Sequence, residues 1–298
     1  MSGKPREISR RAFTSFALAG ALAPFSAKAS AGLPQDPRFV TPDHGLAQTL
    51  IAIGADLSGV AQIPNWDVWT IEPILPTDVV NLGTAQEMNL ELLQRLQPDL
   101  ILSTPYLENV RHQLERIAPV ESFPIHALGT SPYPNILAAT RRLGELSKRE
   151  AAAEELIATT EKTFKAARPK LTRLRSHPLV FLHFIDTRHV RIYGPNCIIQ
   201  DVLDRLDLQN GWPGSINSWG FATAGIERLV DIGDAWVLVF DPVPPDVEAL
   251  LAGNPLWQNL PFVRAGRVRR FPNVLAFGTL PAATRMTRLL TELELDHA

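Results

Sequence analysis

Short apolar segments and longer amphipathic stretches alternate along the first part of the chain. Three segments predict short strands, at residues 38–41, 79–81 and 100–103. Asp43 is placed to cap a helix over 44–53, and Asn89 to cap a helix that runs to Leu96. The alternation continues to about residue 130, and it predicts a parallel sheet with helices on its faces.

The same pattern returns in the second half of the chain. Four further strands are expected, at residues 179–185, 190–193, 235–240 and 268–271. Two further helices are expected, at residues 198–206 and 280–293. Between the halves, residues 134–168 contain no loop-like linker and are rich in good helix formers, so one long helix is expected to join two α/β lobes.

A weak internal repeat supports two similar lobes. Residues 90–96 and 226–232 both read Leu/Ile-Glu-x-Leu-x-x-Leu/Ile, and each leads into a predicted buried strand. The alternative is a chance match, because short amphipathic turns of this kind are common. We predict an N-terminal lobe over 32–145, a connecting helix over 146–170 and a C-terminal lobe over 171–298, with a ligand cleft between the lobes.

The N-terminus reads as a secretory signal peptide over residues 1–31. A basic segment with Arg10 and Arg11 precedes the apolar segment 12–25, which is too short to span a bilayer, and small residues at 27–31 supply cleavage signals. Ser, two Arg, Ala and Phe over 9–13 indicate twin-arginine export. The alternative is a general secretory signal in which two Arg are adjacent by chance. Either way, the periplasm is the expected location.

Composition disfavours several classes of protein. The chain of 298 residues has a net charge of −2, and it is more acidic once the basic signal segment is removed, which disfavours nucleic-acid binding. Cys197 is the single cysteine, so no internal disulfide forms and no lipid-bearing cysteine follows the cleavage site. No apolar run reaches the roughly 18 residues of a membrane span. We expect a soluble monomer without membrane insertion.

Motifs for catalysis and nucleotide binding are absent from the sequence. It has no G-x-G-x-x-G, no G-x-x-x-x-G-K-[ST], no G-x-S-x-G and no H-E-x-x-H, so no catalytic residues are expected. The histidines are scattered, and no resident metal site is predicted. A zinc site assembled across the cleft from His44, His112, His126 and His183 remains as an alternative.

Four tryptophans lie in loop-like segments, two in each half. Trp66 and Trp69 precede Glu-Pro, and Trp212 and Trp219 lie among Gly, Pro, Asn and Ser. Large aromatic side chains in the loops of both lobes indicate a shared aromatic cleft. The alternative is that these residues cover the ends of the sheets.

Several longer segments resemble the periplasmic ferric-hydroxamate siderophore-binding proteins of ABC importers. The similar segments are 89–93 with Pro98-Asp99, 115–119, 184–189, 193–196, 254–258 and 261–267. The resemblance covers essentially the whole chain. Its N-terminal pattern is shared by the wider class of binding proteins for siderophores, haem and cobalamin, whereas its C-terminal segments are more specific to the hydroxamate branch. It implies two lobes joined by one rigid helix with little lobe closure, and a shallow aromatic groove for the ligand. Iron stays coordinated by the siderophore, so no cofactor is expected.

The resemblance also implies site residues. Trp69, Tyr106, Trp212 and Trp219 fall on aromatic pocket positions of the family. Other pocket positions have changed, to His44, Ser103, Leu275 and Phe277. Ala85 stands where the family has a pocket Arg, and Arg191 stands where it has an apolar residue, which leads to the hypothesis that Arg191 supplies the missing cation.

Glu91 and Glu227 occupy the same position in the two copies of the repeat. In the wider class, such paired acids meet Arg pockets on the permease subunits of the importer, so both are predicted docking residues. The alternative is an exposed glutamate at each helix start.

The predicted function is therefore capture of an iron(III)-siderophore, of hydroxamate or citrate-hydroxamate type, and its presentation to the permease and ATPase of an inner-membrane importer. A haem- or cobalamin-binding protein of the same class is the nearest alternative, with Tyr106 as the haem ligand. A metal-ion carrier and an exported α/β enzyme are more distant ones.

Overall fold

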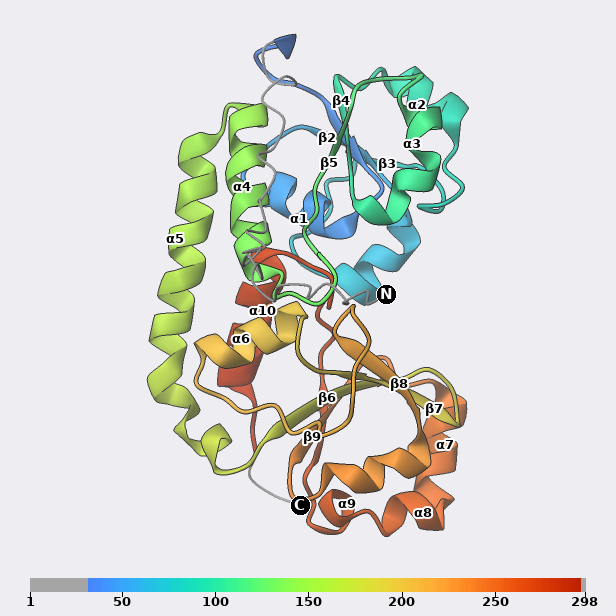
Figure 1. Ribbon diagram of the computed structural model, residues 1–298, viewed down its shortest axis with the longest axis vertical. Helices are drawn as coiled ribbons and strands as arrows, with labels where there is room; N and C mark the ends of the chain where they lie inside the picture. The colour runs from blue at the N-terminus through green and yellow to red at the C-terminus, as the bar shows by residue number, and fades with distance from the viewer. Residues whose placement is uncertain (1–31, 296–298) are drawn as a thin grey trace, which may run out of the picture.

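The computed structural model describes residues 32–295, so the predicted signal peptide over 1–31 lies outside the described residues. Two five-stranded sheets form two lobes, one above the other in Figure 1. Helices pack against both sheets, as the α/β pattern predicts. The alternation of strands and helices along the sequence is therefore confirmed as a two-lobed α/β fold.

The sheet of the N-terminal lobe is parallel throughout, in the order β3-β2-β1-β4-β5. Its strands are β1 (Phe39–Thr41), β2 (Leu57–Val60), β3 (Val80–Asn81), β4 (Leu100–Ser103) and β5 (Val120–Ser122). Its helices include α1 (His44–Ala52), α2 (Leu90–Leu96) and α3 (Arg111–Leu114), with shorter helical turns η2 (Ile63–Asn65), η3 (Trp66–Thr70) and η4 (Pro105–Val110). The two predicted caps form, because Asp43 accepts a hydrogen bond from the Leu46 N–H and Asn89 from the Leu92 N–H.

The sheet of the C-terminal lobe is mixed, in the order β10-β9-β6-β7-β8. Its strands are β6 (Leu179–Phe184), β7 (His189–Tyr193), β8 (Phe221–Gly225), β9 (Trp236–Phe240) and β10 (Val268–Phe271). Strands β6, β9 and β10 are parallel, whereas β7 and β8 run antiparallel to their neighbours. Its helices are α6 (Ile198–Arg205), α7 (Pro245–Gly253), α8 (Pro255–Gln258) and α9 (Pro261–Arg264), with the 3₁₀ turn η6 (Ile226–Ile232).

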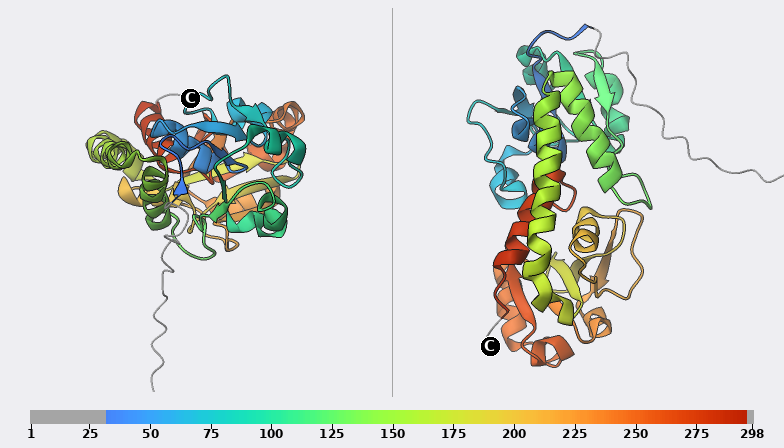
Figure 2. Two further views of the ribbon diagram at one scale, coloured as in Figure 1. Left: turned by 90° about the horizontal axis from the view of Figure 1, so that it is seen from above. Right: turned by 90° about the vertical axis from the view of Figure 1, so that its left-hand side faces the viewer.

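Two helices, rather than the single one expected over 134–168, lie between the sheets in sequence. They are α4 (Tyr133–Ser147) and α5 (Glu150–Ala167), which continues into the turn η5 (Arg168–Ser176). Lys148 has a positive φ of 56° and ends α4, so the chain reverses there. Gly144 permits the tight reversal, because a Cβ at this position would clash with Ala153. The long helix α5 then runs beside both lobes (Figure 2, right).

The last helix, α10 (Leu280–Glu292), returns to the boundary between the lobes and packs against α1, α5 and α6. Before it, the Thr279 hydroxyl donates to the Gly45 carbonyl. Glu72 of the N-terminal lobe pairs with Arg285 and Arg288 of α10 at 2.5 and 2.6 Å. One apolar cluster therefore runs from the first sheet through α4, α5 and α10 into the second sheet. Each large side chain that it buries contributes about 1.5–3 kcal/mol.

Candidate ligand-binding site

A cavity of about 580 Å³ lies where the lobes meet. Trp69 lines it from the N-terminal lobe, and the C-terminal lobe contributes segments 183–185, 242–245 and 273–277 together with Arg191 and Tyr193. These segments follow or end β6, β9 and β10, so the cavity lies at the carboxyl ends of the parallel strands, where α/β folds commonly bind ligands. The lining is mostly apolar with a few polar groups, as in small-molecule sites.

Strand pairing brings the polar groups of this cavity onto one face of the sheet. His183 on β6 lies directly opposite Arg191 on β7, and Tyr193 lies opposite Phe221 on β8. Residues opposite one another on antiparallel strands share a face, and so do residues two apart on one strand. The guanidinium of Arg191 consequently lies over the Phe221 ring, with its Cζ 4.5 Å from the ring centroid.

A hydrogen-bonded chain connects this face to the other lobe. Asn273 donates from its Nδ2 to the carbonyls of Val68 and Trp69, at 2.9 and 3.1 Å. Its Oδ1 is therefore the atom that accepts from His183 Nε2, at 2.9 Å. The proton of the neutral imidazole then lies on Nε2, so Nδ1 accepts from the Tyr193 hydroxyl at 3.1 Å.

Burial sets the charge of both titratable neighbours of Arg191. It lowers the pKa of His183 to about 4, although the hydrogen bond to Asn273 acts in the opposite direction; the charge of Arg191 adds to the lowering. Burial also raises the pKa of Tyr193 above its usual value, although Arg191 opposes this shift. Near neutral pH the imidazole and the phenol are therefore both uncharged.

Aromatic rings extend the site from this cavity across the boundary between the lobes. Tyr106 of the N-terminal lobe meets Trp219 edge to face at 6.3 Å, and Trp219 meets Phe277 at 6.4 Å. Phe277 in turn meets Phe221 at 6.2 Å, beside Arg191. Tyr106 is 63% exposed, so it is accessible to a ligand. The structure thus brings four predicted residues, Tyr106, Trp219, Phe277 and Arg191, into one continuous surface.

Trp69, a fifth predicted residue, lines the same cavity from the N-terminal lobe. It is 40% exposed and its ring centroid lies 5.4 Å from that of His183. The backbone that carries it is held by Asn273. Aromatic rings from both lobes therefore flank the polar face, which agrees with an aromatic cleft rather than with mere cover of the sheet ends.

His44 and Ser103 do not line this cavity. Both ring nitrogens of His44 are already hydrogen-bonded, to the Thr70 hydroxyl at 2.7 Å and to the Ala61 carbonyl at 2.8 Å. Ser103 is 3% exposed at the end of β4. Both side chains support the backbone of the N-terminal lobe, and a direct role for either in ligand binding stays a prediction.

Trp212 lies away from the cavity as well. The N–H of Gly211 donates to the carbonyl of Leu179, which places the Trp212 loop at the amino end of β6, whereas the cavity is at the carboxyl end of that strand. The ring packs against the apolar cluster of the C-terminal lobe. For this tryptophan, the structure favours the alternative of a ring that covers the end of the sheet.

Sequence reasoning missed the roles of His183, Tyr193, Asn273 and Phe221. The alternation of polar and apolar residues over 189–193 carried a signal, because it places Arg191 and Tyr193 on the same face of a strand. Asn273 carried none, because its partners are two backbone carbonyls more than 200 positions away in the sequence and the side chain of His183, 90 positions away.

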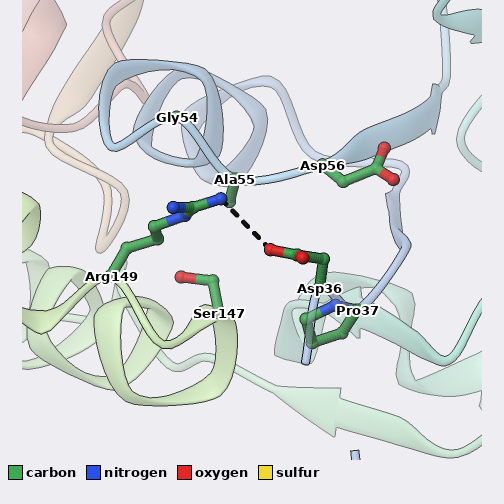
Figure 3. A pocket seen from close by; sticks show the side chains of 7 residues that line it. All are labelled: Asp36, Pro37, Gly54, Ala55, Asp56, Ser147 and Arg149. Carbon is green, nitrogen blue, oxygen red and sulfur yellow. Dashed lines mark hydrogen bonds and ion pairs between the residues drawn. The ribbon is translucent and has the colours of Figure 1, made fainter. Parts of the chain in front are cut away.

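A second cavity, of about 200 Å³, lies at the far end of the N-terminal lobe (Figure 3). It adjoins the amino ends of β1 and β2, opposite the edge that faces the cleft. An ion pair between Arg149 and Asp36, at 3.2 Å, crosses it. Because Arg149, the one cation among the described residues that line it, is already paired with Asp36 and the cavity is small, it is a poor candidate for the ligand site.

Over residues 32–295, no group of three or more His, Cys, Asp or Glu side chains is arranged to hold a metal ion. In the same part of the chain, no helix combines the length and the apolar character needed to cross a membrane.

The chain is similar to known proteins over most of its length. The profile of the periplasmic binding protein family matches residues 40–275. The iron(3+)-hydroxamate-binding protein FhuD of Escherichia coli is 34% identical over 292 residues, which is 97% of each chain. The crystal structure of the siderophore-binding protein FhuD of Vibrio cholerae with bound Fe³⁺–Desferal superposes with a TM-score of 0.80, at 26% identity over 86% of this chain and 97% of that one.

A more distant structure shares the fold. SirA of Staphylococcus aureus, complexed with staphyloferrin B, has a TM-score of 0.64 at 20% identity and covers 88% of this chain and 94% of its own. At this identity the likeness concerns the fold alone.

Proposed function

The chain belongs to the periplasmic binding protein family, and on that premise we propose that it binds an iron(III)-siderophore of the hydroxamate type in the cavity between its lobes. The observation that carries this proposal is the surface of Tyr106, Trp219, Phe277 and Arg191 beside a cavity of about 580 Å³. It combines large apolar area with donors for the ligand's oxygens. The protein captures the complex in the periplasm and delivers it to an ABC importer.

Binding needs no bond to be made or broken. The siderophore keeps its iron, and aromatic rings of the protein pack on the organic shell of the complex. Trp69 lines the cavity and Trp219 contacts Phe277 beside it, whereas Tyr106 and Arg191 direct polar groups at ligand oxygens. The protein is accordingly a carrier and not an enzyme, and its relatives are substrate-binding transport proteins.

The test is a titration of the purified protein with ferric hydroxamates, ferric catecholates, haem and cobalamin, followed by tryptophan fluorescence. Because Trp69 and Trp219 flank the site, saturable quenching by a ferric hydroxamate is expected. Quenching by haem or cobalamin alone would replace the hydroxamate with one of those ligands while keeping the carrier role.

We propose that two exposed carboxylates, one on each lobe, dock the protein on the importer that receives the siderophore. Glu91 lies in the first turn of α2 with its side chain 89% exposed, and Glu227 lies exposed in the first turn of η6. Replacing both by Ala is expected to abolish siderophore-dependent growth while leaving ligand affinity unchanged. The matched control replaces Glu150 and Glu155, which are exposed on α5. Normal growth of the Glu91→Ala/Glu227→Ala strain would refute the docking role.

A further inference from the structure

Arg191 brings a positive charge into the cavity without a negative partner. Its Nε is buried and makes no hydrogen bond. None of the described residues that line the cavity is acidic. Arg191 is half-buried, and a partly desolvated charge without a counter-ion is unfavourable, so this arrangement is more favourable when an anion enters the cavity.

The neighbours of Arg191 position the guanidinium but do not neutralise it. The Phe221 ring supports its face at 4.5 Å. His183 and Tyr193 are uncharged near neutral pH, because burial lowers the pKa of the first and raises that of the second. The side-chain amide of Asn273 is engaged through both its oxygen and its nitrogen. Any negative charge at this point must therefore come from the ligand.

We propose that Arg191 forms a carboxylate subsite in the ligand cavity, so that the protein prefers ferric hydroxamates that carry a free carboxylate. This inference rests on the proposed function and specifies its substrate class. Guanidinium groups bind carboxylates through two parallel N–H donors, and Arg191 lines the cavity. Three hydroxamates neutralise Fe³⁺, so the group outside the chelating centre decides the net charge of such a complex.

The experiment uses three linear ligands that share one chelating chain and differ only at its end. Ferrioxamine B ends in an ammonium group, its N-acetyl derivative is neutral, and its N-succinyl derivative ends in a carboxylate. Dissociation constants are measured by tryptophan fluorescence. The succinyl form is expected to bind most tightly and the ammonium form most weakly, with a ratio between succinyl and acetyl forms on the order of 10- to 100-fold.

Variants assign the preference to one side chain. Arg191→Gln is expected to bring the ratio between succinyl and acetyl forms close to one. Arg191→Lys keeps the charge but loses the planar fork, so an intermediate ratio is expected. The matched control is Arg188→Gln, which removes an exposed charge from the same hairpin outside the cavity and should keep the wild-type ratio.

The possible results distinguish failure of the carboxylate subsite from failure of the proposed hydroxamate-carrier function. Equal binding of the three ligands by the wild-type protein, or tightest binding of ferrioxamine B, overturns the carboxylate subsite and leaves the hydroxamate carrier standing. Binding of none of them overturns both. If Arg191→Gln does not fold, as judged by circular dichroism, the wild-type ligand series and Arg191→Lys decide the question.

Discussion

His183 makes the stability of the protein depend on pH in a way that one substitution can isolate. Its pKa lies at about 4 in the folded protein, against an ordinary value of 6.5 that applies to the unfolded chain. Between these values the unfolded chain binds more protons, so acid favours unfolding. The contribution of the neutral His183 to the free energy of unfolding is present above pH 6.5, and it is lost as the pH falls toward 4. This amounts to a loss of about 2 kcal/mol between about pH 7 and pH 5.

The assay is urea denaturation followed by far-ultraviolet circular dichroism at several pH values in this range. Other groups also titrate, so the informative quantity is the difference between the wild-type protein and His183→Gln, which keeps a donor for Asn273 but cannot be protonated. The variant should lose about 2 kcal/mol less than the wild type on acidification. The control is His112→Gln at an exposed position on α3. Parallel pH profiles for His183→Gln and wild type would show that the imidazole is not held neutral by burial.

Two contrasts test other parts of the structure. Glu121→Ala should cost about 3 kcal/mol of unfolding free energy, because the buried guanidinium of Arg142 donates two N–H groups to that carboxylate, whereas Glu154→Ala, at an exposed ion pair, should cost less than about 1 kcal/mol. Equal losses in urea denaturation would contradict this. Trp219→Ala should weaken ferric hydroxamate binding on the order of tenfold. Trp212→Ala should lower the melting temperature and keep the dissociation constant, and a weakened constant would return Trp212 to the ligand site.

Most elements were predictable because their signals are local. The predicted strands at 100–103 and 268–271 match the observed bounds, and the helix starts at Asp43 and Asn89 depend on side chains beside them in sequence. Strand β8 (Phe-Ala-Thr-Ala-Gly) was not predicted, because most of its residues are small and none is fully buried, so its strand conformation depends on pairing with β7.

The break between α4 and α5 is a second feature that the sequence did not predict. Lys148 and Arg149 are ordinary helix formers, so the sequence around them predicts continuity. What ends α4 is the packing of the two helices against each other around Gly144. Propensity indicates where helix is possible, whereas tertiary contacts decide where it stops.

In the candidate site, too, some features follow from local sequence and others only from tertiary contacts. Trp212 and Trp219 lie in loops of similar composition, and only the pairing of Gly211 with the start of β6 and the contact of Trp219 with Phe277 separate their positions. Arg191 could be singled out from sequence, but the uncharged state of its neighbours follows from burial, which needs the folded structure.

The return of α10 to the N-terminal lobe has a consequence for the order in which the chain can fold. The ribosome makes α10 after the strands of both sheets, yet α1 and α5 pack against it. Domains that emerge early usually fold as they emerge. Here the first lobe lacks part of its apolar contacts until α10 has been made, so a nascent chain that stops before α10 should be more sensitive to proteases than the chain that includes it.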